Sequence, residues 1–534
     1  MNSQLQDVGN SSLEDSPPPI QDSKKKHLKI TMIRGPLIFR EGAVNNEATT
    51  AIGMAYVDGY LRQGGYETTW VDAIAEGLNH IWAPEKYPGF NCQGLTFSEI
   101  LNRIPKNTEV IGFSGMFSGE WPIYRDLINH IKQNFPDTLI VGGGEHFTAL
   151  PEYSLRDCPS LDVCVLGEGE QTFYNLLETY TEKRDFQDVE GIAYIDSSNT
   201  FIGKKGAPPR IRKIDEIGWP YWPKNYLEKF WSAGKSYGVT SKRDMPFLVS
   251  RGCPYQCTFC SSPQMWTTRY ILRDVEDAIK EIKFYIEKYN ITSLQFYDLT
   301  AITKKKWIVE FCQRMIEEKI NLKWSLPSGT RSEVLDEEVL GLLSQTGCNY
   351  LVYAPETASP ESLVLIKKKI HLNQMEESIF EAKRQNIVVR TNLIIGFPHE
   401  KWKDIFKTLA FGLKMAFKGV DEVPVFIFSP YPGTEIFDEL HSNGKLKIED
   451  DYFLKLTSLN SDYLSWNVIS SNPRLNWRVL GFVRTIFILT NYLISYLFHP
   501  SRIIRTIKNI FSENISATVF EHRIKDMLNR KKAT

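Results

Sequence analysis

The chain has 534 residues, with 63 Lys and Arg against 64 Asp and Glu, which gives a formal charge of −1. This balance argues against a globally basic nucleic-acid-binding protein, so we expect no nucleic-acid partner. Hydrophobic residues at 42% and charged residues at 24% exclude a mostly disordered chain. Eight cysteines are too few for a disulfide scaffold, and three of them lie within eight positions of each other.

Residues 1–27 are expected to form a disordered arm, because they hold the run Pro17-Pro18-Pro19 and the cluster Lys24-Lys25-Lys26. No apolar segment precedes a cleavage-like site, so a secretory signal is not expected. We therefore expect the chain to stay in a reducing cytoplasm, where cysteines remain available for metals.

Residues 28–190 alternate between strand and helix patterns. The predicted strands are 27–33, 67–71, 110–114, 139–141 and 163–166, and the predicted helices are 53–63 and 121–134. Alternation at this spacing predicts a doubly wound parallel sheet. Such sheets bind ligands at the carboxyl ends of their strands.

Glycines and polar residues follow three of these strands directly. They are Ser114-Gly115, Gly142-Gly143-Gly144 and Gly167-Glu168-Gly169-Glu170. Each glycine alone could serve only to turn the chain. Three such turns at one edge of a sheet favour a flat ligand laid close to the backbone. No G-x-G-x-x-G follows the first strand, which argues against a dinucleotide.

A proline-rich connector, residues 191–245, precedes a second series of strand and helix patterns at 246–450. The strands are predicted at 246–250, 293–297, 322–326, 350–354, 388–395 and 423–428, with helices that include 275–289 and 304–318. Six such units predict a partial or open βα barrel. Functional groups should gather at the carboxyl ends of its strands.

Three cysteines, Cys253, Cys257 and Cys260, follow the first of these strands with the spacing C-x3-C-x2-C. A structural zinc site needs four ligands, and no second cysteine pair accompanies them. Three thiolates on one loop suit three corners of a 4Fe–4S cluster, which leaves the fourth iron open for a non-protein ligand. The other five cysteines are expected to be packing residues.

This loop at the end of the first strand of a six-unit barrel resembles the radical S-adenosylmethionine enzymes. Residues 28–450 resemble the subgroup with an amino-terminal cobalamin-binding domain, which includes anaerobic magnesium-protoporphyrin ester cyclases, hopanoid methylases and several C- and P-methyltransferases. The resemblance implies three cofactors: a 4Fe–4S cluster, S-adenosylmethionine and cobalamin. It also implies reductive cleavage of S-adenosylmethionine to methionine and a 5′-deoxyadenosyl radical.

The resemblance assigns roles to single positions. Five residues, all in the cluster loop or at the ends of later barrel strands, are expected to contact S-adenosylmethionine: Phe259, Asp298, Glu356, Gly396 and Pro432. For Asp298 and Glu356 the alternative is a surface or capping carboxylate. Five residues at the ends of the first sheet's strands are expected to contact cobalamin: Ser114, Gly143, Gly144, Glu168 and Gly169.

The D-x-H-x-x-G pattern that places a histidine on cobalt is missing. His80, His130 and His146 lack its spacing and are expected to be surface or packing residues. The subgroup commonly lacks the pattern too, so its absence leaves cobalamin in place and predicts no histidine ligand to cobalt.

The implied activity is methylation of an unactivated carbon of a small, hydrophobic substrate, with an external electron donor of the flavodoxin or ferredoxin type. The alternative is an oxidative cyclase or hydroxylase, which shares the same parts. A non-catalytic cobalamin sensor is a third possibility, but a sensor has no need of the cysteine triad.

The carboxyl-terminal region, 451–534, is expected to be helical and basic. Residues 474–534 hold eleven Lys and Arg against three acids, a formal charge of +8. Val479–Phe498 is apolar and just long enough to span a bilayer, although Arg484 interrupts it. The next segment, with Arg502, Arg505 and Lys508, is amphipathic, which favours a helix on an anionic membrane surface. The alternative is a helical cap buried against the barrel.

Overall fold

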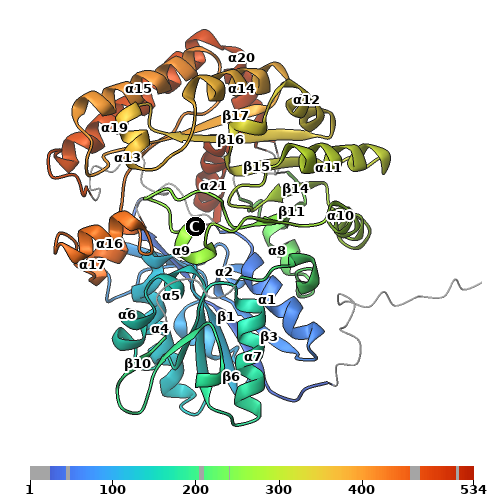
Figure 1. Ribbon diagram of the computed structural model, residues 1–534, viewed down its shortest axis with the longest axis vertical. Coiled ribbons are helices and arrows are strands. Elements are labelled where there is room, and N and C mark those ends of the chain that lie inside the picture. The colour runs from blue at the N-terminus through green and yellow to red at the C-terminus, as the bar shows by residue number, and fades with distance from the viewer. Residues whose placement is uncertain are drawn as a thin grey trace, which may run out of the picture.

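The computed structural model describes residues 25–43, 48–203, 210–237, 239, 241–457, 470–512 and 516–533. Most of the predicted arm, 1–27, therefore lies outside the described residues. Two α/β units are stacked along the long axis (Figure 1), with the amino-terminal sheet at the bottom in blue and teal and the second sheet above it in green to orange.

The first unit is a seven-stranded sheet in the order β10-β9-β8-β7-β6-β1-β3. Its five parallel strands are β1 (Ile30–Arg34), β3 (Thr68–Asp72), β6 (Val110–Ser114), β7 (Leu139–Gly143) and β8 (Val163–Val165). These strands match the predicted ones to within three residues at each end. Helices connect the successive parallel strands, as expected for a doubly wound fold.

Helices cover both faces of this sheet. They are α1 (Ile52–Gln63), α2 (Ala73–Glu76), α3 (Phe97–Leu101), α4 (Trp121–Asn134), α5 (Glu145–Ala149), α6 (Pro151–Asp157) and α7 (Gly169–Thr181). Met32 packs in the core that holds α1 and α7, and its neighbour Ile33 packs in the core that holds α4. Alternate residues of one strand thus serve two cores, which is why apolar residues occupy successive positions in these strands.

Two features of this unit were not predicted. A small antiparallel sheet, β2 (Leu37–Arg40), β5 (Phe90–Gln93) and β4 (Ile81–Trp82), lies beside the main one. The predicted connector also contributes regular structure, because β9 (Ile192–Ile195) and β10 (Phe201–Ile202) extend the sheet as antiparallel strands. The remainder of the connector includes α8 (Tyr226–Ser232). Proline is concentrated only between these elements, so the connector prediction was too broad.

The second unit is a six-stranded sheet that is parallel throughout, in the order β11-β14-β15-β16-β17-β18. Its strands are β11 (Asp244–Phe247), β14 (Ser293–Phe296), β15 (Lys323–Thr330), β16 (Cys348–Glu356), β17 (Val388–Ile395) and β18 (Val425–Ile427). A sheet in sequence order, with no pairing between β18 and β11, is a partial barrel. This confirms the predicted fold class.

The helices of the second unit are α10 (Val275–Tyr289), α11 (Lys305–Glu317), α12 (Glu337–Gln345), α13 (Pro360–Leu365), α14 (Leu372–Arg384), α15 (Trp402–Phe417), α16 (Glu435–Ser442) and α17 (Asp450–Leu456). Figure 1 shows α10, α11, α12, α14 and α15 arranged around the outside of the sheet. Leu351 and Tyr353 of β16 face this helical layer, since the Tyr353 hydroxyl contacts Ser378 of α14. Tyr350 and Val352 therefore face the barrel interior.

The carboxyl-terminal region is helical, as predicted. It forms α19 (Trp477–Phe498), α20 (Ser501–Phe511) and α21 (Val519–Ala533). Helix α19 packs on α15 and on β18, the edge strand of the barrel. Glu422 accepts hydrogen bonds from the first amides of α21, at Val519 and Phe520, and Val519 packs against Tyr350 and Val352. The end of the chain thus closes the base of the barrel.

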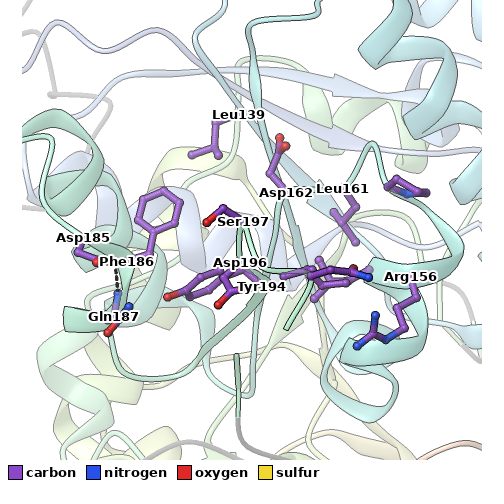
Figure 2. A pocket seen from close by; sticks show the side chains of 14 residues that line it. Leu139, Arg156, Leu161, Asp162, Asp185, Phe186, Gln187, Tyr194, Asp196 and Ser197 are labelled. Carbon is purple, nitrogen blue, oxygen red and sulfur yellow. Dashed lines mark hydrogen bonds between the residues drawn. The ribbon is translucent and has the colours of Figure 1, made fainter. Parts of the chain in front are cut away.

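A cavity of about 840 Å³ opens at the amino ends of β7 and β8 (Figure 2). Leu139, Asp162, Phe186 and Tyr194 line it. The glycine turns follow the opposite, carboxyl ends of the same strands. This cavity is therefore remote from the predicted site.

Candidate active site

The cysteine triad lies in the loop between β12 (Ser250–Arg251) and α9 (Ser262–Trp266). The loop begins at Gly252 with a φ of +83°, and a Cβ there would lie 2.4 Å from the carbonyl oxygen of Arg269. Only glycine allows this turn. The Thr258 amide donates to the carbonyl of Ile366 at 3.1 Å, which fixes the far side of the loop. The cluster loop is thus held by backbone contacts on both sides.

The three thiols are free and partly exposed, whereas the other five cysteines are free and buried. Burial, followed by the neighbouring charges of Cys257, Glu145 and Cys253, raises the pKa of Cys260 to about 12. The three cysteines share one loop, in which the Cys260 amide donates to the Cys257 carbonyl at 3.1 Å. Since a thiol must lose its proton to ligate iron, cluster assembly at this loop should release protons.

Asp298 follows β14 and is buried against the start of the cluster loop. Its carboxylate accepts hydrogen bonds from the amides of Val249 and Ser250, at 3.1 and 2.5 Å, and from the Ser250 hydroxyl. Burial raises its pKa to about 6. Asp298 therefore positions the strand that leads into the cysteines, and a surface role is excluded by its 1% exposure.

Glu356 ends β16 with a φ of +66°, a backbone conformation rare for a residue with a Cβ. Its carboxylate pairs with Lys368 at 2.9 Å, and the Lys368 ammonium lies 5.9 Å from the centre of the Phe259 ring. The Lys368 side chain is 11% exposed, and the negative charge of Glu356, followed by that of Cys257, raises its pKa against the effect of burial. Strained backbone of this kind is concentrated at functional sites.

Gly396 follows β17 with a φ of +90°, and its amide donates to the Glu400 carboxylate at 2.7 Å. The Phe397 amide donates to the same oxygen at 3.1 Å. Burial raises the pKa of Glu400 to about 7. Glu400 was not predicted from the sequence. A carboxylate four residues after a glycine turn is nevertheless a detectable signal for a side chain that accepts hydrogen bonds from the amides of that turn.

We expect the Glu400→Gln variant to retain the conformation of the loop at Gly396, and the Glu400→Ala variant to lose it. The glutamine oxygen can still accept both amides, whereas alanine leaves two buried N–H groups unsatisfied, at roughly 1–3 kcal/mol each. Because the pKa of Glu400 is raised above its unfolded value, its contribution to stability is lost as the pH rises through about 7. Thermal unfolding of the full chain, measured at pH values below and above about 7, should therefore show a flatter pH dependence for Glu400→Gln than for the wild type. Parallel profiles for the wild type and this variant would contradict the assignment.

Phe259 and the loop after β18 complete the site. The Phe259 ring lies 5.7 Å from that of Phe397, so the residue before the last cysteine touches the Gly396 loop. Pro432 is buried in the loop between β18 and α16. Beside it, a Cβ on Gly433 would lie 3.1 Å from the Cβ of Ala149, which belongs to α5 of the first unit.

The glycine turns of the first sheet and the cluster loop of the second meet directly. Glu145, immediately after Gly144, accepts a hydrogen bond from Ser261, immediately after Cys260. Helices α5 and α9 pack together at this point. The carboxyl edge of the first sheet therefore faces the carboxyl edge of the barrel across a direct contact.

Glu168 lies at a second contact between the units. Its buried carboxylate accepts from Arg210 at 2.7 Å and from Arg251 at 3.1 Å, and Arg251 also pairs with Glu170 at 2.6 Å. Arg251 directly precedes the cluster loop. Glu168, expected to contact cobalamin, thus has its carboxylate engaged by the arginines that join the two units.

The remaining predicted residues line the carboxyl edge of the first sheet. Ser114 pairs in register with Gly143, and Gly143 with Val165. A Cβ on Gly143 would meet only Val165, at 4.0 Å, and one on Gly169 would meet only valine side chains. Next to Ser114 lie two residues that the sequence analysis missed, Met116 and Phe117, which are about half exposed. Open space beside exposed apolar side chains suits a flat, largely apolar ligand.

The histidine nearest this edge is a packing residue, as expected. His146 is fully buried, with its Nδ1 3.0 Å from the Ser118 hydroxyl and its Nε2 3.2 Å from that of Ser154. Burial lowers its pKa to about 3. Both ring nitrogens are engaged, so His146 is not available as a metal ligand.

Comparison with protein families matches both units. The model of the radical SAM superfamily matches residues 247–412, and that of the B12 binding domain matches residues 43–177. The chain belongs to the cobalamin-binding radical S-adenosylmethionine enzymes. Its cofactors are a 4Fe–4S cluster, S-adenosylmethionine and cobalamin.

Individual relatives agree with this assignment. The enzyme is 28% identical over 428 residues to an uncharacterised methyltransferase of Pyrococcus horikoshii, covering 79% of this chain and 85% of that one. It is 26% identical over 392 residues to an anaerobic magnesium-protoporphyrin IX monomethyl ester cyclase of Rubrivivax gelatinosus, covering 72% and 65%. The structure of the radical S-adenosylmethionine methyltransferase TsrM from Kitasatospora setae has the same fold, with a TM-score of 0.63, 13% identity, and coverage of 95% and 99%.

The residues present fit these cofactors. Three free, partly exposed cysteines on one loop offer the three thiolates that such a cluster takes from a protein. The buried hydroxyls of Thr258, Ser262 and Thr300 make no hydrogen bond within the described part of the chain. They lie in the cluster loop, at the first residue of α9 and after β14, where a polar ligand such as S-adenosylmethionine would satisfy them.

Proposed function

We propose that the enzyme transfers a methyl group to an unactivated carbon of a small hydrophobic substrate. The direct contact between the glycine turns and the cluster loop, through Glu145 and Ser261, carries this proposal. When bound, the cluster supplies the electron that cleaves S-adenosylmethionine, and cobalamin supplies a transferable methyl group. Two such groups act on one substrate only if their binding edges face each other, as these do.

The chain's own residues hold this arrangement in place. Cys253, Cys257 and Cys260 would hold the cluster, while Asp298 fixes the strand that enters their loop. Phe259, Glu356, Gly396 and Pro432 would border S-adenosylmethionine. Ser114, Gly143, Gly144 and Gly169 would border the corrin edge, with no histidine on cobalt.

A second candidate is oxidative cyclisation or hydroxylation, and the similarity to the Rubrivivax gelatinosus cyclase favours it. The similarity to the Pyrococcus horikoshii methyltransferase, which spans more of both chains, favours methylation. A cobalamin sensor is a third class, but a loop that presents three free thiols serves no purpose in a sensor.

We propose further that the enzyme acts in the cytoplasm with a flavodoxin- or ferredoxin-type electron donor. The exposed apolar helices of its carboxyl-terminal region support peripheral contact with a membrane, which would give access to a hydrophobic substrate.

Isotope transfer tests the proposal. The reconstituted enzyme is incubated anaerobically with a reductant, S-adenosylmethionine bearing a trideuterated methyl group, and an apolar extract of the source cells. Methylation predicts 5′-deoxyadenosine together with a product that carries the deuterated methyl group. A product that is oxidised but unlabelled would replace methylation by the cyclase alternative, and the absence of 5′-deoxyadenosine would overturn both.

A further inference from the structure

Helix α19 buries three polar side chains together with Leu480 and Phe487, and it turns three of its leucines toward solvent. Arg484, Asn491 and Ser495 are each 3% exposed, whereas Leu489, Leu493 and Leu497 are 59, 67 and 70% exposed. A surface helix of a water-soluble protein has the opposite arrangement. The outward side of α19 is therefore built for an apolar environment.

Buried contacts fix this orientation. Arg502 of α20 donates to the Ser495 hydroxyl at 2.6 Å and to the carbonyl of Val420 at 3.0 Å. Arg505 pairs with Asp421 at 2.9 Å. Rotating α19 to bury its leucines would break these contacts. The two arginines, expected from the sequence to face a membrane, instead anchor the helices to the barrel.

The exposed apolar surface continues beyond the leucines. Phe482 and Ile486 extend it along α19, and the Phe498 ring packs at 4.6 Å on Phe417 of α15. On α20, Ile504 and Phe511 are 72 and 84% exposed. We call the exposed aliphatic and aromatic side chains of α19 and α20 the apolar face. Surfaces of this extent on a soluble protein mark an interaction site.

The charges around the apolar face select its partner. Residues 470–512 contain no Asp or Glu. Exposed basic side chains flank the apolar residues, at Lys418 beside Phe417, Arg478 beside Val479, and Lys508 beside Ile507. Apolar residues bordered by cations, with no acids among them, complement an anionic bilayer. The apolar side chains enter its acyl region, and the basic side chains pair with its headgroups.

The manner of contact also follows from the packing. Helix α19 is long and apolar enough to cross a membrane, the one such helix among the described residues. A crossing would expose Arg484 and Asn491 to lipid and detach α19 from α15. At 22 residues the helix is roughly 33 Å long, enough to lie along a membrane surface.

We infer that the apolar face docks flat on an anionic lipid bilayer, with α19 and α20 parallel to its surface and the barrel on the cytoplasmic side. This inference rests on the membrane contact proposed above and specifies its geometry. It does not depend on whether the reaction is methylation or oxidative cyclisation.

Co-sedimentation of the full chain with vesicles tests the inference. We expect pelleting with phosphatidylcholine vesicles that contain phosphatidylglycerol, and weaker pelleting with phosphatidylcholine alone. The triple variant Leu489→Asp, Leu493→Asp, Leu497→Asp should lower binding at least about tenfold, because three side chains lose their acyl contact. The matched control, Ile316→Asp with Phe406→Asp, changes exposed apolar residues on α11 and α15 and should bind like the wild type.

Two further measurements separate the possible outcomes. The variant should still produce 5′-deoxyadenosine in solution, so loss of docking is distinguishable from loss of function. Sizing by analytical ultracentrifugation should show the same mass for the wild type and the variant. If the wild type stays in the supernatant, or if the triple variant binds vesicles as well as the wild type, the bilayer does not occupy this face. If the wild type is a dimer and the triple variant a monomer, the apolar face binds a second copy of the chain instead.

Discussion

The Cys257→Ala chain is expected to produce no 5′-deoxyadenosine under anaerobic conditions in which the wild-type chain does. Cys257 lies in a loop fixed at Gly252 and Thr258, so its neighbours cannot shift to replace it. Cys253 and Cys260 lie in the same loop. Removing one of three ligands leaves the cluster without a stable site. Chromatography of the nucleoside product, with iron and sulfide content, measures the effect.

Cys312→Ala provides the matched control. Cys312 is fully buried in α11, where the Thr346 hydroxyl lies 3.7 Å from its sulfur. Its loss should lower stability modestly through the cavity it leaves, with cluster content and nucleoside product unchanged. Activity in Cys257→Ala, or loss of the cluster in Cys312→Ala, would show that the ligands had been assigned to the wrong cysteines.

The parts of the fold that depend on local pattern were predictable from the sequence. Helices α4 and α10 and strands β6 and β17 begin and end at the predicted residues, because each has a clear boundary in the sequence pattern. The small β2-β5-β4 sheet was not predicted, since its strands are short and lack alternation. Strand β9 lies in the segment that the proline content had marked as a connector, so it was not predicted.

Contacts between residues that are distant in the chain could not be predicted from the sequence. The hydrogen bond between Glu145 and Ser261 joins positions 116 residues apart, and its existence depends on how two domains dock. The same holds for Glu168, whose partners Arg210 and Arg251 come from the connector and the barrel. The sequence placed Glu168 at the correct edge of the sheet, but it did not indicate what the carboxylate binds.

The orientation of α19 could not be predicted for a different reason. Hydropathy identifies an apolar helix, and both a membrane-facing helix and a buried cap satisfy that description. In the structure the side bearing Arg484 and Asn491 is buried, while the leucine side is exposed. Usual patterning rules would have buried the leucines.

A bulky residue at Gly143 is expected to abolish cobalamin binding without unfolding the chain. The backbone at Gly143 is not in the left-handed region, and an added Cβ would contact only Val165, at 4.0 Å. The side chain of Gly143→Leu would therefore enter open space beside Ser114 and the exposed Phe117. If the corrin edge rests there, the leucine occupies its place, and affinity should fall at least about a hundredfold, equivalent to roughly 2.7 kcal/mol.

Gly144→Leu distinguishes a blocked ligand from a damaged fold. Gly144 has a φ of +117°, and its Cβ would lie 2.5 Å from the carbonyl oxygen of Gly115, so this change should lower the melting temperature as well as cobalamin binding. Absorbance titration with hydroxocobalamin and thermal unfolding of the cobalamin-free chain measure the two effects separately. Gly143→Leu should change only the titration. If it binds cobalamin as tightly as the wild type, the corrin does not lie against β7, and the glycine turns serve only the close approach of Gly144 to Gly115.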